Sequence, residues 1–231
     1  RNTTAKDGRI EGKTLRIKAV IFDLDGTLVD SIQGIAYSLN RMLAENGFPV
    51  HSVEECKNMV GNGFIELVRR ALPENHRSDE EISRCLSRLR EIYGRHFDYG
   101  MYVYDGMTDL LEYLQSHNVR FAVDTNKDEG VAREIMQRFF PGFSFFRVAG
   151  TTPDMPKKPN PARALSILSD MGVSPVECIY LGDSEVDIIT AKNAGVMPVS
   201  AAWGFRGAER LAAAGAENII QKPMELVRYL V

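Results

Sequence analysis

The chain of 231 residues has little cysteine: only Cys56, Cys85 and Cys178 occur, widely spaced and without a CxxC pair. This number and spacing argue against a disulfide framework or a zinc site, and they favour a reducing compartment such as the cytoplasm. We therefore expect all three residues to be buried or half-buried free thiols.

Strong charge and long apolar runs are also absent. The formal net charge is only −3, which argues against non-specific binding to nucleic acid or to an anionic membrane. No apolar run is long enough to span a bilayer. The first 16 residues are polar and lack the apolar centre of a secretory signal, so we expect a flexible extension over 1–16.

What the sequence contains is an ordered series of apolar segments. Residues 17–24 are short, apolar and β-branched, which predicts a buried strand, whereas residues 31–100 show only helical spacing. From residue 101 onward, helical segments alternate with short apolar ones. The predicted strands there cover 119–124, 145–149, 178–181, 198–202 and 218–220.

This alternation predicts an α/β fold, a Rossmann-like parallel sheet with helices on both faces. The helical block follows the first strand and precedes the others. We therefore expect an α/β core formed by 17–30 and 101–231, with residues 31–100 inserted as an all-α helical cap domain.

Two carboxylates follow the first predicted strand, in the segment that runs from Asp23 to Thr27 (DLDGT). Because residues i and i+2 of an extended chain project to the same side, Asp23 and Asp25 can face one reacting group. A divalent cation would relieve their repulsion. The alternative is an Asp-Gly turn with a carboxylate that caps a helix.

Two further clusters also stand at predicted strand ends, where parallel sheets bind ligands. Thr125 and Asn126 offer a hydroxyl and an amide to phosphate oxygens, or they only cap the next helix. Lys157 and Lys158 precede a proline-rich helix start. A lysine held there is a point charge for an anion, although a solvated surface pair is the alternative.

The fourth cluster runs from Gly182 to Asp187 (GDSEVD) after the predicted strand 178–181. Asp183 and Asp187 lie one helical turn apart and share a face, so with Asp23 they can form an oxygen-rich magnesium site. Alternatively, they are acidic residues favoured by the helix dipole. Together, the four clusters suit transfer of a phosphoryl group, and no P-loop motif is present.

The order of these motifs resembles the haloacid dehalogenase superfamily of phosphatases, over residues 19–195. The resemblance implies that Asp23 is the nucleophile that becomes an aspartyl-phosphate. It implies that Asp25 is the acid that protonates the leaving oxygen and later the base that activates water. Dehalogenase members lack an acid at the position of Asp25, so its presence indicates phosphate ester chemistry.

The same resemblance implies a Mg²⁺ cofactor. Its ligands would be Asp23, the backbone carbonyl of Asp25, and Asp183, while Asp187 would bind it through water or orient the loop.

For the phosphate, the resemblance implies binding by Thr125, Asn126 and Lys158, with Lys158 also offsetting charge near Asp23. We choose Lys158 over Lys157 because it directly precedes a proline.

Two stretches, 59–72 and 203–223, resemble phosphoglycolate phosphatases. Within the first, Gly61, Asn62 and Gly63 would present backbone N–H groups and an amide to a carboxylate, or the glycines only form an interhelical turn. Asp124 departs from the pattern, because relatives carry an apolar residue there. If its side chain faces inward, it adds negative charge beside the phosphate.

We expect a magnesium-dependent phosphate monoester hydrolase for a small phosphorylated metabolite, 2-phosphoglycolate first. A β-phosphoglucomutase-like sugar phosphomutase, a pyrophosphatase or a nucleotidase would need the same motifs, and a non-catalytic binding module is the remote alternative. The expected protein is a cytoplasmic monomer or homodimer that binds neither nucleic acid nor membrane.

Overall fold

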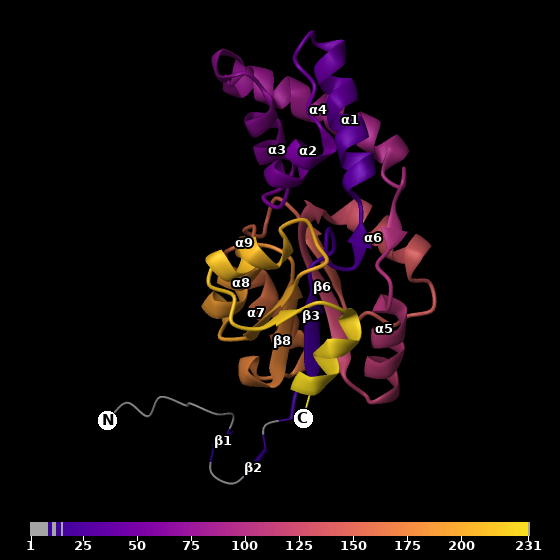
Figure 1. Cartoon of the computed structure of the whole chain (residues 1–231), viewed down its shortest axis with the longest axis vertical. Coiled ribbons are helices and arrows are strands. Elements are labelled where there is room, and N and C mark those ends of the chain that lie inside the picture. The colour runs from indigo at the N-terminus through magenta and orange to yellow at the C-terminus, as the bar shows by residue number, and fades with distance from the viewer. Residues whose placement is uncertain (1–8, 11–12, 15, 231) are drawn as a thin grey trace, which may run out of the picture.

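A six-stranded sheet forms the centre of the computed structural model, which describes residues 9–10, 13–14 and 16–230 (Figure 1). Its strand order is β10-β9-β8-β3-β6-β7, and all neighbouring strands are parallel, which confirms the predicted fold class. The strands are β3 (Ala19–Phe22), β6 (Arg120–Asp128), β7 (Val148–Thr151), β8 (Cys178–Gly182), β9 (Met197–Ala201) and β10 (Ile219–Ile220).

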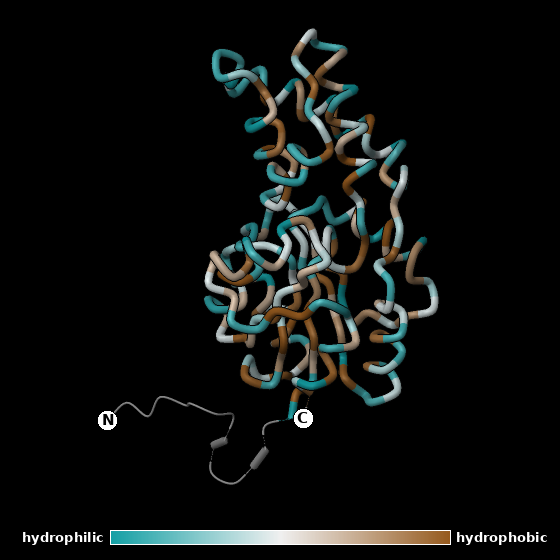
Figure 2. The backbone as a smooth tube through the Cα atoms, in the orientation of Figure 1, coloured by the Kyte–Doolittle hydropathy of each residue, from teal (hydrophilic) through white to brown (hydrophobic). Residues whose placement is uncertain are grey.

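Both faces of the sheet are buried, which explains why the first strand is continuously apolar. Val20 and Phe22 pack on one side, against a cluster that includes α5 (Met107–Ser116) and α6 (Glu129–Phe139). Ala19 and Ile21 pack on the other side, against α7 (Ala162–Met171) and α8 (Glu185–Ala194). Figure 2 shows that apolar residues, in brown, follow one another along the centre of the sheet. The remaining elements of this part are α9 (Gly207–Ala213), η2 (Pro175–Glu177) and η3 (Pro223–Tyr229).

Four helices form a separate layer above the sheet, which we call the helical cap (residues 32–96; Figure 1). They are α1 (Ile32–Glu45), α2 (Val53–Met59), α3 (Phe64–Ala71) and α4 (Asp79–His96), with η1 (Glu74–His76) between the last two. The cap has its own apolar cluster, in which Leu39, Leu67 and Leu89 are almost completely buried. As its sequence suggests, Ser78 caps α4, since its hydroxyl accepts a hydrogen bond from the Glu81 amide.

The two connections between sheet and cap pair with each other. β4 (Val29–Asp30) runs antiparallel to β5 (Tyr102–Val103), and the sequence pattern did not predict this short ribbon. The chain leaves the sheet through β4 and returns through β5, close to the boundaries that we expect for the inserted domain. The division into two domains stays a prediction.

Strand β6 is longer than the sequence predicted. The expected strand ended at Asp124, because the polar residues that follow resemble a loop, but the strand continues to Asp128 with a register shift against β7. This extension carries Thr125, Asn126 and Lys127 beyond the apolar part of the sheet and toward the cap.

The polar extension expected over 1–16 falls mostly outside the described residues. Within it, β1 (Arg9–Ile10) and β2 (Lys13–Thr14) pair as antiparallel strands. In the part of the chain that the structure describes, no helix is both long enough and apolar enough to cross a membrane.

Candidate active site

A cleft of about 530 Å³, partly open to solvent, lies between the sheet and the helical cap. Asp23, Thr125 and Asp183 line it from the carboxyl ends of β3, β6 and β8, as expected for a parallel sheet. Gly61 and Phe64 line it from the cap. Three of the four motifs that the sequence placed at separate strand ends therefore meet at one cavity.

Asp23 lies at the base of this cleft with its side chain 11% exposed. Its Oδ1 accepts a hydrogen bond from the Leu24 amide at 2.7 Å and lies 3.0 Å from Lys158 Nζ. Burial, together with the negative charge of Asp187, raises the pKa of Asp23 to about 7. The carboxylate therefore needs additional positive charge to be fully ionised at neutral pH.

Lys158 is the buried cation beneath Asp23. Its Nζ also lies 2.7 Å from Asp187 Oδ1, so it bridges two carboxylates. Burial lowers the pKa of Lys158, but Asp187 and Asp23 raise it more, so the pKa lies above its ordinary value and the ammonium stays charged. Asp187 Oδ2 accepts hydrogen bonds from the amide and hydroxyl of Ser184, at 3.1 and 2.6 Å. Both oxygens of Asp187 thus have protein partners, which suits a residue that orients the loop.

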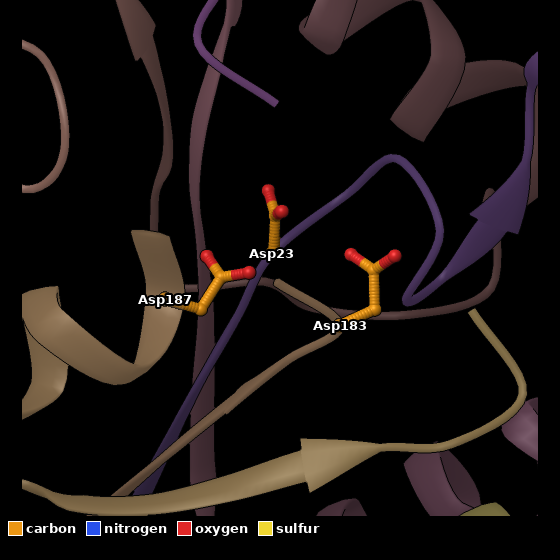
Figure 3. A group of neighbouring side chains, drawn as sticks. All are labelled: Asp23, Asp183 and Asp187. Carbon is orange, nitrogen blue, oxygen red and sulfur yellow. The ribbon is translucent and has the colours of Figure 1, made fainter. Parts of the chain in front are cut away.

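Asp23, Asp183 and Asp187 form a buried acidic triad, with one carboxylate oxygen of each within 4.8 Å of the others. Figure 3 shows the three carboxylates turned to the same side. Burial and the charges of Asp187 and Asp23 raise the pKa of Asp183 well above its usual range. Repulsion of this kind is relieved by a divalent cation, and an all-oxygen donor set is the one that Mg²⁺ prefers.

Asp183 is held in place by the loop after β9. Its Oδ2 accepts a hydrogen bond from the Phe205 amide at 2.7 Å. Gly204 packs directly on it, because a Cβ on this glycine would lie 2.3 Å from Asp183 Cβ. The ligand set expected for Mg²⁺ thus fits the residues present, although the Asp25 carbonyl remains a prediction.

Asp25 has a cation of its own. Its Oδ1 accepts a hydrogen bond from the Ser31 hydroxyl at 2.5 Å and lies 3.1 Å from Lys127 Nζ. Its side chain is 20% exposed, more than that of Asp23. The two neighbouring carboxylates therefore face two different lysines.

Asn126 connects three parts of the site. Its amide nitrogen donates to the carbonyls of Gly61 in the cap and of Lys158, both at 3.1 Å. Its Oδ1 accepts from the Lys158 amide at 2.9 Å and from Arg163 at 3.1 Å. These contacts occupy the side chain, so the structure shows Asn126 holding the Lys158 segment. Its expected contact with phosphate stays a prediction, as does that of Thr125.

Asp124 does not face the cleft. Its carboxylate is completely buried and accepts hydrogen bonds from Arg163 Nε at 2.5 Å and from the Tyr180 hydroxyl at 3.1 Å. Arg163 also donates to Asn126, so the ion pair of Arg163 and Asp124 helps to hold Asn126 in place. Asp124 therefore adds no unpaired negative charge beside the phosphate, because its carboxylate is paired with Arg163.

The predicted carboxylate-binding turn of the cap is only partly directed at the cleft. Gly61 and Gly63 line it, and Gly63 has φ +82°, where a Cβ would lie 3.1 Å from the Asn126 carbonyl oxygen. Asn62 is absent from the lining of this cleft, and its Oδ1 accepts a hydrogen bond from Arg70. A role of these residues in binding a carboxylate stays a prediction.

Sequence reasoning assigned no role to Lys127 or Arg206. Lys127 directly follows Asn126 in the sequence. Because the predicted strand ended at Asp124, the sequence did not predict that Lys127 lies on β6 and lines the cleft. Nη1 and Nη2 of Arg206 donate to the carbonyls of Lys57 and Val60 in the cap, which lie 149 and 146 residues away in the sequence. No local signal in the sequence marks such a contact.

Comparison with known proteins supports the family resemblance of the sequence. The sequence profile of the haloacid dehalogenase-like hydrolases matches residues 20–201. A phosphoglycolate phosphatase of Pseudomonas savastanoi pv. phaseolicola is 34% identical over 215 residues, covering 91% of this chain and 78% of that protein. A phosphoglycolate phosphatase of Rhodospirillum rubrum is 36% identical over 205 residues, covering 86% and 85%.

Among solved structures, a haloacid dehalogenase-like family hydrolase from Streptococcus pneumoniae superposes with a TM-score of 0.83 at 26% identity. The match covers 93% of this chain and 99% of that one. The matched range includes the helical cap and five of the six strands of the central sheet, β3 to β9. The chain therefore belongs to the haloacid dehalogenase-like hydrolases.

Proposed function

We propose that the protein is a magnesium-dependent phosphate monoesterase, and that 2-phosphoglycolate is its first candidate substrate. The observation that carries the proposal is the pairing of Asp23 and Asp25 with two different buried lysines at the edge of one cleft. The named relatives support the substrate, since two of them are phosphoglycolate phosphatases. Three buried free cysteines in the described chain support a reducing setting such as the cytoplasm.

The chemistry proceeds in two displacements. A carboxylate oxygen of Asp23 forms a bond to phosphorus while the bond from phosphorus to the ester oxygen breaks, and Asp25 gives its proton to that leaving oxygen. In the second step Asp25 takes a proton from water. The water oxygen then bonds to phosphorus, which releases phosphate and restores Asp23.

The surrounding residues hold the charges that these steps require. Lys158 offsets the negative charge that gathers between Asp23 and the phosphoryl oxygens, and Asp187 keeps that ammonium in place. Mg²⁺, held by Asp23 and Asp183, would supply further positive charge to the phosphoryl group. Its binding would also favour the ionised form of Asp23, which burial disfavours.

The test is phosphate release from a panel of esters, with and without Mg²⁺. The panel contains 2-phosphoglycolate, sugar phosphates, pyrophosphate and nucleoside monophosphates. We expect release that depends on Mg²⁺, with the highest kcat/KM for 2-phosphoglycolate. An isomerised sugar phosphate in place of free phosphate would identify a phosphomutase and overturn the proposal.

The mechanism is tested by Asp23→Asn, which keeps the shape of the side chain and removes the nucleophile. We expect kcat to fall by at least about ten-thousand-fold, because loss of an essential nucleophile costs up to about a million-fold. Asp109→Asn is the matched control, because Asp109 is an exposed carboxylate on α5 and its loss should leave kcat unchanged. Wild-type activity in Asp23→Asn would contradict the mechanism.

A further inference from the structure

Lys127 is a second buried cation of the cleft, and the mechanism above does not use it. Its side chain is 3% exposed, and its Nζ lies 3.1 Å from Asp25 Oδ1. The same nitrogen donates to the Tyr93 hydroxyl of α4 at 2.7 Å. It also lies 4.5 Å from the centre of the Tyr93 ring and 5.6 Å from that of Phe64 in α3. Lys127 thus connects Asp25 of the core with two aromatic residues of the cap, Tyr93 and Phe64.

The ammonium of Lys127 has room for another partner. An ammonium carries three N–H donors, and within residues 16–230 the recorded acceptors are Asp25 and Tyr93. Burial lowers the pKa of Lys127, but Asp25 and Tyr93 raise it more, so the pKa lies above its ordinary value and the group is charged. Lys127 also lines the cleft, so a ligand can reach its side chain.

Among the described residues, the cations that line the cleft are Lys127 and Arg206, and Lys158 lies next to it against Asp23. Lys158 bridges Asp23 and Asp187 beneath the attacking carboxylate. Arg206 pairs with Glu185 and donates to carbonyls of the cap. Lys127 therefore supplies the positive charge on the side of Asp25.

The roles of the two carboxylates determine which part of a substrate lies there. The phosphorus must contact Asp23, and the leaving oxygen must lie within hydrogen-bond distance of Asp25. The carbon attached to that oxygen then continues past Asp25, where Lys127 is the nearest recorded cation. A group that lies one or two carbons from the ester oxygen would meet the Lys127 ammonium and the rings of Phe64 and Tyr93.

We propose that Lys127 is a specificity-determining residue that selects phosphate esters carrying a carboxylate one or two carbons from the ester oxygen. This inference rests on the proposed phosphatase function, and it assigns to Lys127 the recognition of the group attached to the phosphate. A neutral hydroxyl in the same place can accept the remaining hydrogen bond of the ammonium, but that bond is weaker than one to a charged carboxylate. The preference therefore comes from the charge of the group that meets Lys127.

The experiment compares 2-phosphoglycolate with 2-hydroxyethyl phosphate, which has the same two-carbon skeleton and a hydroxymethyl group in place of the carboxylate. We expect the wild-type protein to prefer 2-phosphoglycolate by at least about tenfold in kcat/KM, the size expected for a hydrogen bond to a charged group. In Lys127→Met this ratio should fall by about 10- to 100-fold, mainly because KM for the carboxylate ester rises.

The ratio separates selectivity from support of Asp25. If Lys127 only holds Asp25, the variant loses activity toward both esters by the same factor, the ratio stays at its wild-type value, and the inference is overturned. Lys192→Met is the matched control, since Lys192 on α8 is exposed and donates to the Gly215 carbonyl at the surface, so its loss should leave the ratio unchanged.

The wild-type protein alone can also overturn the inference, should Lys127→Met fail to fold. Equal kcat/KM for the two esters would overturn the role of Lys127 while leaving the phosphatase function intact. Release of phosphate from neither ester, nor from any other member of the panel, would instead overturn the proposed function on which the inference rests.

Discussion

The core and the cap use charged residues in different ways. Beneath the cleft, Arg163 pairs with Asp124 and Lys158 with Asp187, and these side chains are at most 3% exposed. On the cap, Arg88 pairs with Glu45 and Glu91, and these side chains are between 34% and 48% exposed. The core pairs lie beneath the candidate active site, whereas the cap pairs lie at the surface, one between α1 and α4 and the other within α4.

This difference predicts how each part tolerates change. A buried pair that loses one member leaves an uncompensated charge in a medium of low dielectric constant, which destabilises a protein strongly. An exposed pair that loses one member leaves a charge that water solvates. The core should therefore be sensitive to single substitutions of charge, and the cap should tolerate them.

The largest effect is expected for Arg163→Met, which leaves the buried Asp124 carboxylate without its cation. The free energy of unfolding should fall by about 3 to 5 kcal/mol, measured by urea denaturation. Arg88→Met is the matched substitution in the cap, and it should cost about 1 kcal/mol or less. Equal losses in the two variants would contradict the comparison. Adding Asp124→Asn to Arg163→Met should recover part of the loss, because the unpaired charge is then removed.

These two regions also differ in how far the sequence predicted them. The buried strand β3, the acidic motifs and the helical cap follow from local patterns: apolar runs, i and i+2 carboxylates, and helical spacing. The pairing of Arg163 with Asp124 does not, because it joins residues 39 positions apart whose types suggest solvent exposure. The contact of Arg206 with α2 is longer still in sequence. Patterns reveal which residues the strand ends carry, but packing decides which partner each charge meets.

The second prediction concerns pH, to which core and cap should respond in opposite directions. The pKa of Asp23 is about 7 in the folded, metal-free protein and about 3.8 when unfolded, chiefly because of burial. The folded state therefore binds the proton more tightly, so this contribution to stability is full below pH 3.8 and is lost as the pH rises to about 7. The loss should reach at most about 4 kcal/mol.

In the cap, a hydrogen bond from Arg88 is the main reason why the pKa of Glu45 is lowered to about 2 from 4.5. Its contribution is present above pH 4.5 and is lost as the pH falls through about 2. Urea denaturation in EDTA between pH 4 and 7.5 measures the buried carboxylates of the core, Asp23 and Asp183, because Glu45 loses its contribution mostly below this range. Asp23→Asn should reduce this pH dependence while Glu45→Gln leaves it intact, and Mg²⁺ should restore stability more at pH 7.5 than at pH 4. The same slope in Asp23→Asn and wild type would exclude Asp23 as its source.

The smallest effect is expected where the two regions meet. Arg206 belongs to the core, is 4% exposed, and donates to the Lys57 and Val60 carbonyls at the end of α2. Arg206→Ala removes these bonds, so α2 should exchange its amide hydrogens faster and KM should rise by about tenfold, with a smaller change in kcat.

The nearby Arg210 provides the control, because it contacts Asn58 on the same helix but is 44% exposed. Arg210→Ala should change KM by no more than about twofold, since water replaces its contacts. If both variants behave alike, burial is not what makes the contact between core and cap strong. If only Arg206→Ala speeds amide exchange in α2, buried charges matter more than exposed ones at the boundary of the two regions as well. A buried charge of the core then fixes the position of the cap, whose own exposed charges are largely dispensable.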